Sequence, residues 1–168
     1  MHKLIPDIKW ITLLLTLFIL PGCGYHLRQS AELPASISPI MINGLNIKTG
    51  FGREMAYRLK SDTVQVTEDR QKANTMLRIS SYRQKSRTIT VDGSAKVAQT
   101  ELKHPLSFDL LDATGKILVP KQDLKVVRNF INTEEQKLGK ITEAEQLSEG
   151  MRQELIRMIM LRIKTHLK

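Results

Sequence analysis

The feature that most constrains the fold is a run of alternating apolar and polar residues from Thr75 to Val91, which ends at Asp92-Gly93. Alternation with a period of two predicts a half-buried β-strand, and Asp-Gly is a strong signal for a hairpin turn. The return run, from Ala95 to Leu111, also keeps its apolar residues at one parity. A turn at residues 112–115 then leads into a third alternating run, from Lys116 to Ile131. The middle of the chain is therefore predicted to form an antiparallel meander.

The first of these runs is unusually long for a small domain. Seventeen residues would extend about 56 Å at ~3.3 Å per residue, beyond the usual length of a strand. Residues 83–88 carry no apolar side chain, so this stretch is expected to project from the core or to cross a polar environment. Pro105 is expected at a sheet edge or a bulge, because it lacks the N–H that a strand ladder needs. The apolar residues predicted to share the inner face are Leu77, Ile79, Ile89, Val91, Ala98, Leu102, Leu106, Phe108, Leu110, Leu124, Val126 and Phe130.

Two helices and two short strands complete the predicted fold. Strands are expected at Ile40–Ile42 and Thr63–Thr67, and a helix from a Thr49 cap to Lys60. A last helix is predicted to begin at a capping box, Thr142–Glu145, and its apolar stripe fits packing against the sheet. The predicted fold class is α+β, a two-layer sandwich of a mostly antiparallel four-stranded sheet with two helices packed on one face. The residues of the stripe are Leu147, Met151, Leu155, Ile156, Ile159, Met160, Ile163 and Leu167.

The N-terminal residues indicate the compartment. Trp10–Leu20 is an uncharged apolar run of eleven residues, which suits the core of a signal peptide and is too short to span a bilayer as a helix. Leu20-Pro21-Gly22-Cys23 resembles a bacterial lipobox, whose cysteine carries diacylglycerol and an N-acyl chain. An uncleaved anchor and an inert buried cysteine are the alternatives. The chain is accordingly divided into a cleaved lipoprotein signal peptide (1–22), a lipidated N-terminus and tether (23–38) and a single α+β domain (39–168).

Nothing in the sequence indicates catalysis. The chain has one cysteine and four scattered histidines, which leaves no recognisable metal site, and it contains no nucleophile elbow, P-loop or zinc-protease motif. Apart from the lipid on Cys23, no cofactor is predicted. The chain is expected not to be an enzyme.

The charge distribution favours an anionic partner. The chain holds 26 Lys and Arg against 17 Asp and Glu, a net charge of +9. Between Arg70 and Lys96 there are seven basic residues and one acid, Asp92. One interpretation is a solvated edge strand that Lys and Arg protect from aggregation. The other is a site for a polyanion, and phosphorylated glycolipid is the polyanion available to a protein that faces the periplasm, whereas nucleic acid is not expected there.

The mature N-terminus, Cys23-Gly24-Tyr25-His26-Leu27-Arg28, resembles that of the LPS-assembly lipoprotein LptE family. The order of later motifs is also similar: the basic hairpin, Ser107–Leu110, Val127–Phe130 and a helix containing Glu149-Gly150-Met151. The resemblance implies a lipid-anchored protein of the outer membrane. It also implies a protein that plugs the lumen of a large β-barrel of the LptD type, helps the barrel assemble and binds lipopolysaccharide on its way to the outer leaflet.

The resemblance also implies candidate ligand-binding residues. A lysine in the loop before the last helix, implicated in lipopolysaccharide contact in the family, matches Lys140. The family's arginine before the hairpin tip is replaced by Val91, so Lys96 or Arg87 is expected to take its place. The alternative function is a free-standing, periplasm-facing adaptor lipoprotein without specificity for lipopolysaccharide.

Overall fold

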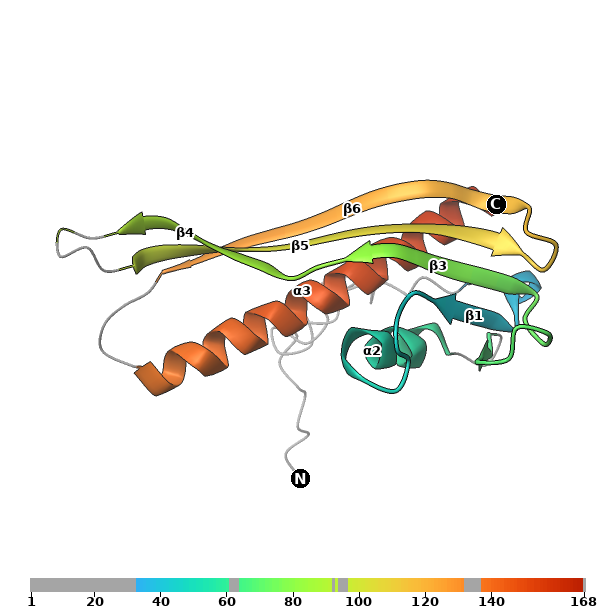
Figure 1. Cartoon of the computed structure of the whole chain (residues 1–168), viewed down its shortest axis with the longest axis horizontal. Coiled ribbons are helices and arrows are strands. Elements are labelled where there is room, and N and C mark those ends of the chain that lie inside the picture. Colours follow the sequence, from blue (N-terminus) through green and yellow to red (C-terminus); the bar gives the residue numbers. More distant parts are fainter. Residues whose placement is uncertain (1–32, 61–63, 92, 94–96, 132–136, 168) are drawn as a thin grey trace, which may run out of the picture. The chain divides into compact units, whose positions relative to one another are not determined.

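A computed structural model describes residues 33–60, 64–91, 93, 97–131 and 137–167. Six strands, two α-helices and one short 3-10 helix, η1, make up this part of the chain (Figure 1). In chain order they are η1 (Ala35–Ile37), β1 (Ile40–Asn43), α2 (Gly50–Leu59), β2 (Val66–Thr67), β3 (Thr75–Tyr82), β4 (Lys85–Val91), β5 (Val97–Asp112), β6 (Ile117–Ile131) and α3 (Lys137–His166).

The six strands form one mixed sheet. β1 pairs in parallel with both β2 and β3, and the other pairings are antiparallel. The α+β class with two helices is confirmed, whereas the four-stranded, mostly antiparallel sheet is wrong. Two causes explain the difference. The connection through α2 brings β3 alongside β1 in the same direction, as in a βαβ unit, and the long run from Thr75 to Val91 forms two strands instead of one.

The division of that run into β3 and β4 coincides with Pro105 on the neighbouring strand. β5 is central: β6 pairs along one edge, and β3 and β4 pair one after the other along the opposite edge. Tyr82, the last residue of β3, pairs with Leu106, and Lys85, the first of β4, pairs with Lys103. Pro105 thus lies opposite the break, where its missing N–H leaves no ladder bond unmade. The expectation of an edge or bulge for Pro105 is wrong, because a gap between two partner strands serves the same purpose in a central strand.

The hydrophobic core lies between the sheet and the helices. α3 packs against β5 and β6, α2 packs against α3, and both helices lie on the same side of the sheet (Figure 1). The alternating pattern is confirmed for seven residues that are all buried: Leu77, Ile79, Leu106, Phe108, Leu110, Leu124 and Val126. Ile89 was assigned to the same face but is 40% exposed. A β-bulge between Ile79 and Ser81 in β3 reverses the alternation, because Tyr82 and not Ser81 then pairs with the buried Leu106. The odd-numbered residues of β4 therefore no longer face the core.

The last helix begins earlier than predicted. α3 extends from Lys137 to His166, so the Thr142–Glu145 capping box lies within the helix and does not begin it. Between Lys137 and Thr142 the helix contains no proline, and its one glycine, Gly139, weakens a helix without ending it. The apolar stripe is confirmed, since Met151, Leu155, Ile156, Ile159 and Ile163 are all at most 2% exposed. No helix among the described residues is long and apolar enough to cross a membrane.

The segment before β1 belongs to the packed domain. Leu33 and Ile37 are buried in the core. The Thr75 hydroxyl donates to the Ile37 carbonyl oxygen at 2.6 Å, and the Gln65 N–H donates to Ser38 Oγ at 3.0 Å. The last residues of the segment assigned to the tether therefore contribute to the packed domain, because Leu33 and Ile37 supply apolar side chains that the core encloses.

Gly44 ends β1 and is required there. Its φ of +90° lies in the left-handed region, and a Cβ atom would stand 2.1 Å from the Ile79 carbonyl oxygen. The strand expected at Ile40–Ile42 thus ends one residue later, at Asn43, and Gly44 allows the close approach to β3 that follows.

Candidate functional site

The sheet has one face toward the helices and one face away from them. Residues 102, 104 and 106 of β5 point toward the helices, because Leu106 is buried and His104 Nε2 lies 3.4 Å from Ser148 Oγ on α3. Side chains alternate along a strand, so Glu101, Lys103 and Asp109 lie on the opposite face. We call this helix-free side of β3 to β6 the polar face.

At the β4 end of the polar face, three basic side chains surround one carboxylate. Lys85 pairs with Lys103 and Arg87 with Glu101 across β4 and β5, so all four side chains share this face. Glu101 Oε1 lies 3.3 Å from Arg87 Nη2 and 3.2 Å from Lys103 Nζ. Together with Ser86, these residues line a cleft of about 330 Å³, which we call the basic cleft. Its three cations against one acid make it a chemically suitable place for a phosphate.

Further along the polar face, the polar side chains are paired. Arg78 on β3 forms a two-point ion pair with Asp109 on β5, with Nε donating to Oδ1 at 2.9 Å, and this carboxylate raises the pKa of the guanidinium. Ser81 Oγ lies 3.2 Å from Ser107 Oγ, which donates to Asp123 on β6. This part of the face is therefore polar but nearly self-neutralised, whereas the basic cleft retains excess positive charge.

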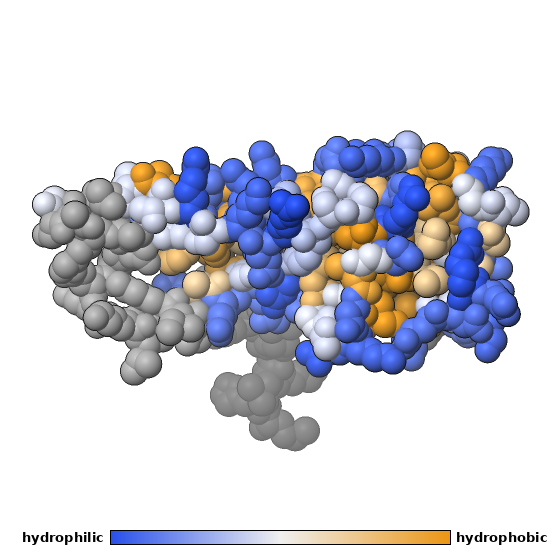
Figure 2. All heavy atoms as spheres, in the orientation of Figure 1, coloured by the Kyte–Doolittle hydropathy of each residue, from blue (hydrophilic) through white to orange (hydrophobic). Residues whose placement is uncertain are grey.

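A second hollow, of about 200 Å³, lies beside β1 and is partly apolar. Its lining includes Met41, Leu45 and Ile47. An exposed ion pair, Lys48 Nζ to Glu68 at 3.3 Å, belongs to the same lining. Apolar side chains gather in this region on the face shown in Figure 2, next to β1 and α2. It has no counterpart of the three-cation arrangement of the basic cleft.

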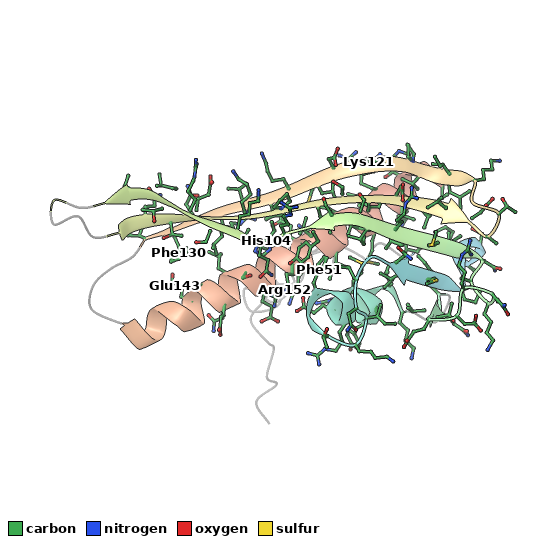
Figure 3. The ribbon with its side chains drawn as sticks, in the orientation of Figure 1. Phe51, His104, Lys121, Phe130, Glu143 and Arg152 are labelled. Atoms are coloured by element: carbon green, nitrogen blue, oxygen red, sulfur yellow. The ribbon has the colours of Figure 1, made fainter. Side chains whose placement is uncertain are left out.

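On the other side of the sheet, His104 is the centre of a polar group that the helices enclose. Phe51 of α2 stacks on Tyr82 at a centroid distance of 4.2 Å, and Tyr82 meets His104 edge to face. Arg152 of α3 donates from Nε to both oxygens of Glu54 at 2.9 and 3.0 Å, and Figure 3 shows Phe51, His104 and Arg152 converging between the sheet and the helices. His104 is 1% exposed, and its Nδ1 has no hydrogen-bond partner among the described residues.

The surroundings of His104 disfavour its charged form. Burial first, and then the positive charge of Arg152, lower the pKa of His104 from its ordinary value of 6.5. Burial likewise raises the pKa of Tyr82, because the phenolate would lose solvation. This group has the character of a packed polar core.

The first testable prediction concerns His104. Because its folded pKa is below its unfolded pKa, the unfolded chain takes up the proton first as the pH falls. The free energy of unfolding should therefore decrease below pH 6.5, by at most about 1.4 kcal/mol per pH unit, until the folded pKa is passed. The variant His104→Phe should lose this component of the pH dependence in urea titrations at several pH values from 7.5 to 5. Identical pH dependences of the two proteins would contradict the assignment.

The predicted site residues fall partly within the described chain. Arg87 lies in β4, in the basic cleft. Lys140 lies in the first turns of α3 and not in a preceding loop, because the helix begins at Lys137. Cys23 and Lys96 lie outside the described residues.

Sequence patterns missed several members of these groups. In the sequence Lys85 is visible only as part of the basic run, and no local pattern marks Lys103 or Glu101, because their proximity depends on the β4–β5 register. His104 shares the parity of Leu102 and Leu106, which was a signal that it faces the helices. Among the described residues, no group of three or more acidic, histidine or cysteine side chains could hold a metal ion.

Solved structures define the class of protein. The fold is similar to that of lipoprotein B from Nitrosomonas europaea, with a TM-score of 0.64 and 25% identity over 82% of this chain and 88% of the other. It is also similar to the rare lipoprotein B from Shewanella oneidensis, with a TM-score of 0.63, 18% identity and coverage of 76% and 95%. The second likeness shows the fold alone. A mixed sheet that carries two helices thus gives this chain the α+β fold of these bacterial lipoproteins.

The family follows from the sequence comparisons. The family model for lipopolysaccharide-assembly, LptE, matches residues 35–163, and the chain belongs to this family. It is 24% identical over 157 residues to the LPS-assembly lipoprotein LptE of Photorhabdus laumondii, covering 92% of this chain and 85% of the relative. It is 25% identical over 162 residues to that of Yersinia pestis, covering 89% and 75%. Membership implies a role in lipopolysaccharide assembly at the outer membrane, in a family of non-enzymatic lipoproteins.

Proposed function

We propose that this protein is a lipid-anchored plug inside a large outer-membrane β-barrel of the LptD type, that it helps the barrel assemble and that it binds lipopolysaccharide during insertion into the outer leaflet. In this proposal Cys23 carries the lipid anchor, and the domain is oriented toward the periplasm and the barrel lumen. The family match supports the general role in assembly. The finer assignment rests on the polar face.

The observation that carries the proposal is the combination of a paired polar surface with a local excess of positive charge. Barrel lumens are polar, so a protein that occupies one should present satisfied polar side chains, as Arg78, Asp109 and Ser107 are. The basic cleft adds three cations against one acid on the same face. Phosphate groups of lipopolysaccharide suit such a cluster, since charge-assisted hydrogen bonds are the strongest that surface side chains form.

The interaction with a barrel is tested by isolation of the protein from detergent-solubilised outer membrane. We expect an affinity-tagged chain to retain one large β-barrel protein in a stoichiometric complex that resists heating in detergent. Recovery of the chain without a stoichiometric barrel would support the free-standing adaptor instead. The control is a double variant of the exposed Lys48–Glu68 pair, Lys48→Gln with Glu68→Gln, which lies outside strands β3 to β6. This variant should retain the same barrel protein.

The lipopolysaccharide-binding residues proposed from the sequence are Lys140, Lys96 and Arg87. Reversal of two of them, Lys96→Glu with Lys140→Glu, should weaken lipopolysaccharide binding roughly tenfold or more, since one decade corresponds to about 1.4 kcal/mol. Titration of purified lipopolysaccharide, followed by calorimetry or fluorescence, measures this. Unchanged circular dichroism would establish that the fold survives.

The control for this double variant is reversal of two lysines elsewhere, Lys116→Glu with Lys121→Glu. Lys116 directly precedes β6 and Lys121 lies in the first half of that strand, whereas β4 lies near the last residues of β6 (Figure 3 labels Lys121). This double variant carries the same change in net charge. Equal losses for the two double variants, which disappear together in about 0.5 M salt, would indicate attraction by net charge and not a local site.

A further inference from the structure

Glu101 occupies an unusual position in the basic cleft. Its single Oε1 atom is shared by Arg87 from β4 and Lys103 from its own strand, at 3.3 and 3.2 Å. The side chain of Glu101 is only 16% exposed, whereas that of Arg87 is 71% exposed and that of Lys103 34%. The carboxylate therefore lies at the base of the cleft, with the cations above it.

The two cations keep donors that this carboxylate does not use. An arginine guanidinium carries five N–H donors and a lysine ammonium three, and the contacts to Glu101 engage one nitrogen of each. Lys85, paired with Lys103 in the register, adds a third ammonium to the same cleft. With one acid among three cations, the cleft retains two positive charges, which a phosphate monoester dianion matches.

Apolar side chains border the same end of the polar face. Ile131 of β6 pairs with Gln99, two residues from Glu101 on β5, so it lies on this face about 7 Å along the strand. It is 68% exposed. Ile89, two residues after Arg87, lies at the irregular end of β4 and is 40% exposed. Cations beside exposed isoleucines suit a ligand that carries both phosphates and hydrocarbon chains.

We infer that Glu101 is an internal competitor for the ligand's phosphate: it holds Arg87 and Lys103 in position while the basic cleft is empty, and a phosphate of an amphiphilic ligand displaces it from both. This inference rests on the proposed function, because it takes the phosphorylated glycolipid as the ligand. It adds Lys85 and Lys103 to the proposed contacts and assigns Glu101 a role that lowers affinity. Without ligand, Arg87 and Lys103 stay in position because the carboxylate of Glu101 pairs with both of them.

The test compares two carboxylates that are each paired with a lysine. Glu101→Gln removes the competitor, and Glu68→Gln removes the partner of Lys48 at the separate hollow beside β1. Both substitutions raise the net charge by one and release a lysine. Binding is measured to phosphatidylcholine vesicles that contain bisphosphorylated lipid A, to the same vesicles with dephosphorylated lipid A, and to inorganic phosphate alone.

We expect Glu101→Gln to increase affinity for the phosphorylated vesicles roughly two- to fivefold, the range of a modest ion pair, and Glu68→Gln to change it less than about 1.5-fold. Neither variant should gain affinity for the dephosphorylated vesicles. Equal effects of the two variants, or weaker binding by Glu101→Gln, would overturn the inference. Binding of inorganic phosphate as tight as binding of the phosphorylated vesicles would make free phosphate the ligand and would also overturn it.

A second pair of variants does not alter Glu101, whose largely buried side chain the fold could require. Arg87→Gln should lower affinity for the phosphorylated vesicles about threefold or more, and Lys48→Gln should not, although both residues are about equally exposed. Equal effects of these two variants would overturn the inference even if Glu101→Gln failed to fold. Absence of binding by the unaltered protein would instead contradict the proposed function. The two failures are therefore distinguishable.

Discussion

Replacement of Leu155 by alanine is expected to lower the free energy of unfolding by about 2 to 5 kcal/mol. Leu155 is fully buried in the middle of α3, where this helix packs against β5 and β6. Removal of its branched end both forfeits burial and leaves a cavity, because the surrounding core relaxes only in part. Denaturant titration of the purified domain measures the change, and Ile159→Ala, at an equally buried position one turn later, should behave similarly.

The matched control is Leu161→Ala on the same helix. Leu161 is 53% exposed, so the same substitution there should change the free energy of unfolding by less than about 0.5 kcal/mol. Equal effects at Leu155 and Leu161 would mean that helix propensity, and not burial, determines the loss. A loss below ~0.5 kcal/mol at Leu155 would contradict the packing of α3 on the sheet.

The sequence could predict which side chains form the core, because that information is local. Alternation places Leu106, Phe108 and Leu110 on one face of β5, and spacing near four places Leu155 and Ile159 on one face of α3. Both patterns depend only on the geometry of a single strand or helix. For this reason they held wherever the strand remained regular, and failed at Ile89, because the bulge between Ile79 and Ser81 reverses the alternation before β4 begins.

The sheet itself could not be predicted as well, because its topology depends on residues far apart in the chain. The break after Tyr82 coincides with Pro105 on another strand, and the parallel pairing of β1 with β3 depends on how α2 crosses between them. The start of α3 was missed for a related reason. A capping box identifies residues that can begin a helix, but it does not prevent the preceding turn from being helical.

The candidate site shows the same division between local and long-range information. The basic run that contains Lys85 and Arg87 is visible in the sequence, but its counter-ion Glu101 and the third cation Lys103 become neighbours only through the β4–β5 register. Arg152 and Glu54 are 98 residues apart, and no local pattern connects them. Charge composition could therefore indicate an anionic partner without distinguishing the free cations from the paired ones.

Loss of the lipid anchor is expected to have the largest effect on the protein's location. The variant Cys23→Ala should abolish stable attachment to the outer membrane, because two or more acyl chains are needed for stable anchoring and Cys23 is the only cysteine of the chain. The domain should remain folded and become soluble, since Leu33, the first described residue that packs into the core, lies ten positions further along. Fractionation of cells that lack the barrel partner, followed by carbonate and salt washes, measures the membrane-bound fraction.

The partner must be absent in this experiment, because binding to a barrel would retain the protein at the membrane without its lipid. Cys23→Ser is a useful companion variant, since it keeps a small polar side chain but offers no thiol for acylation, and it should behave as Cys23→Ala does. A signal peptide left uncleaved in either variant would hold the chain in the inner membrane through Trp10–Leu20, so the mass of the recovered protein has to be measured as well. Recovery of the cleaved alanine variant in washed outer membrane would show that another part of the chain binds the membrane, and Cys23 would no longer account for anchoring.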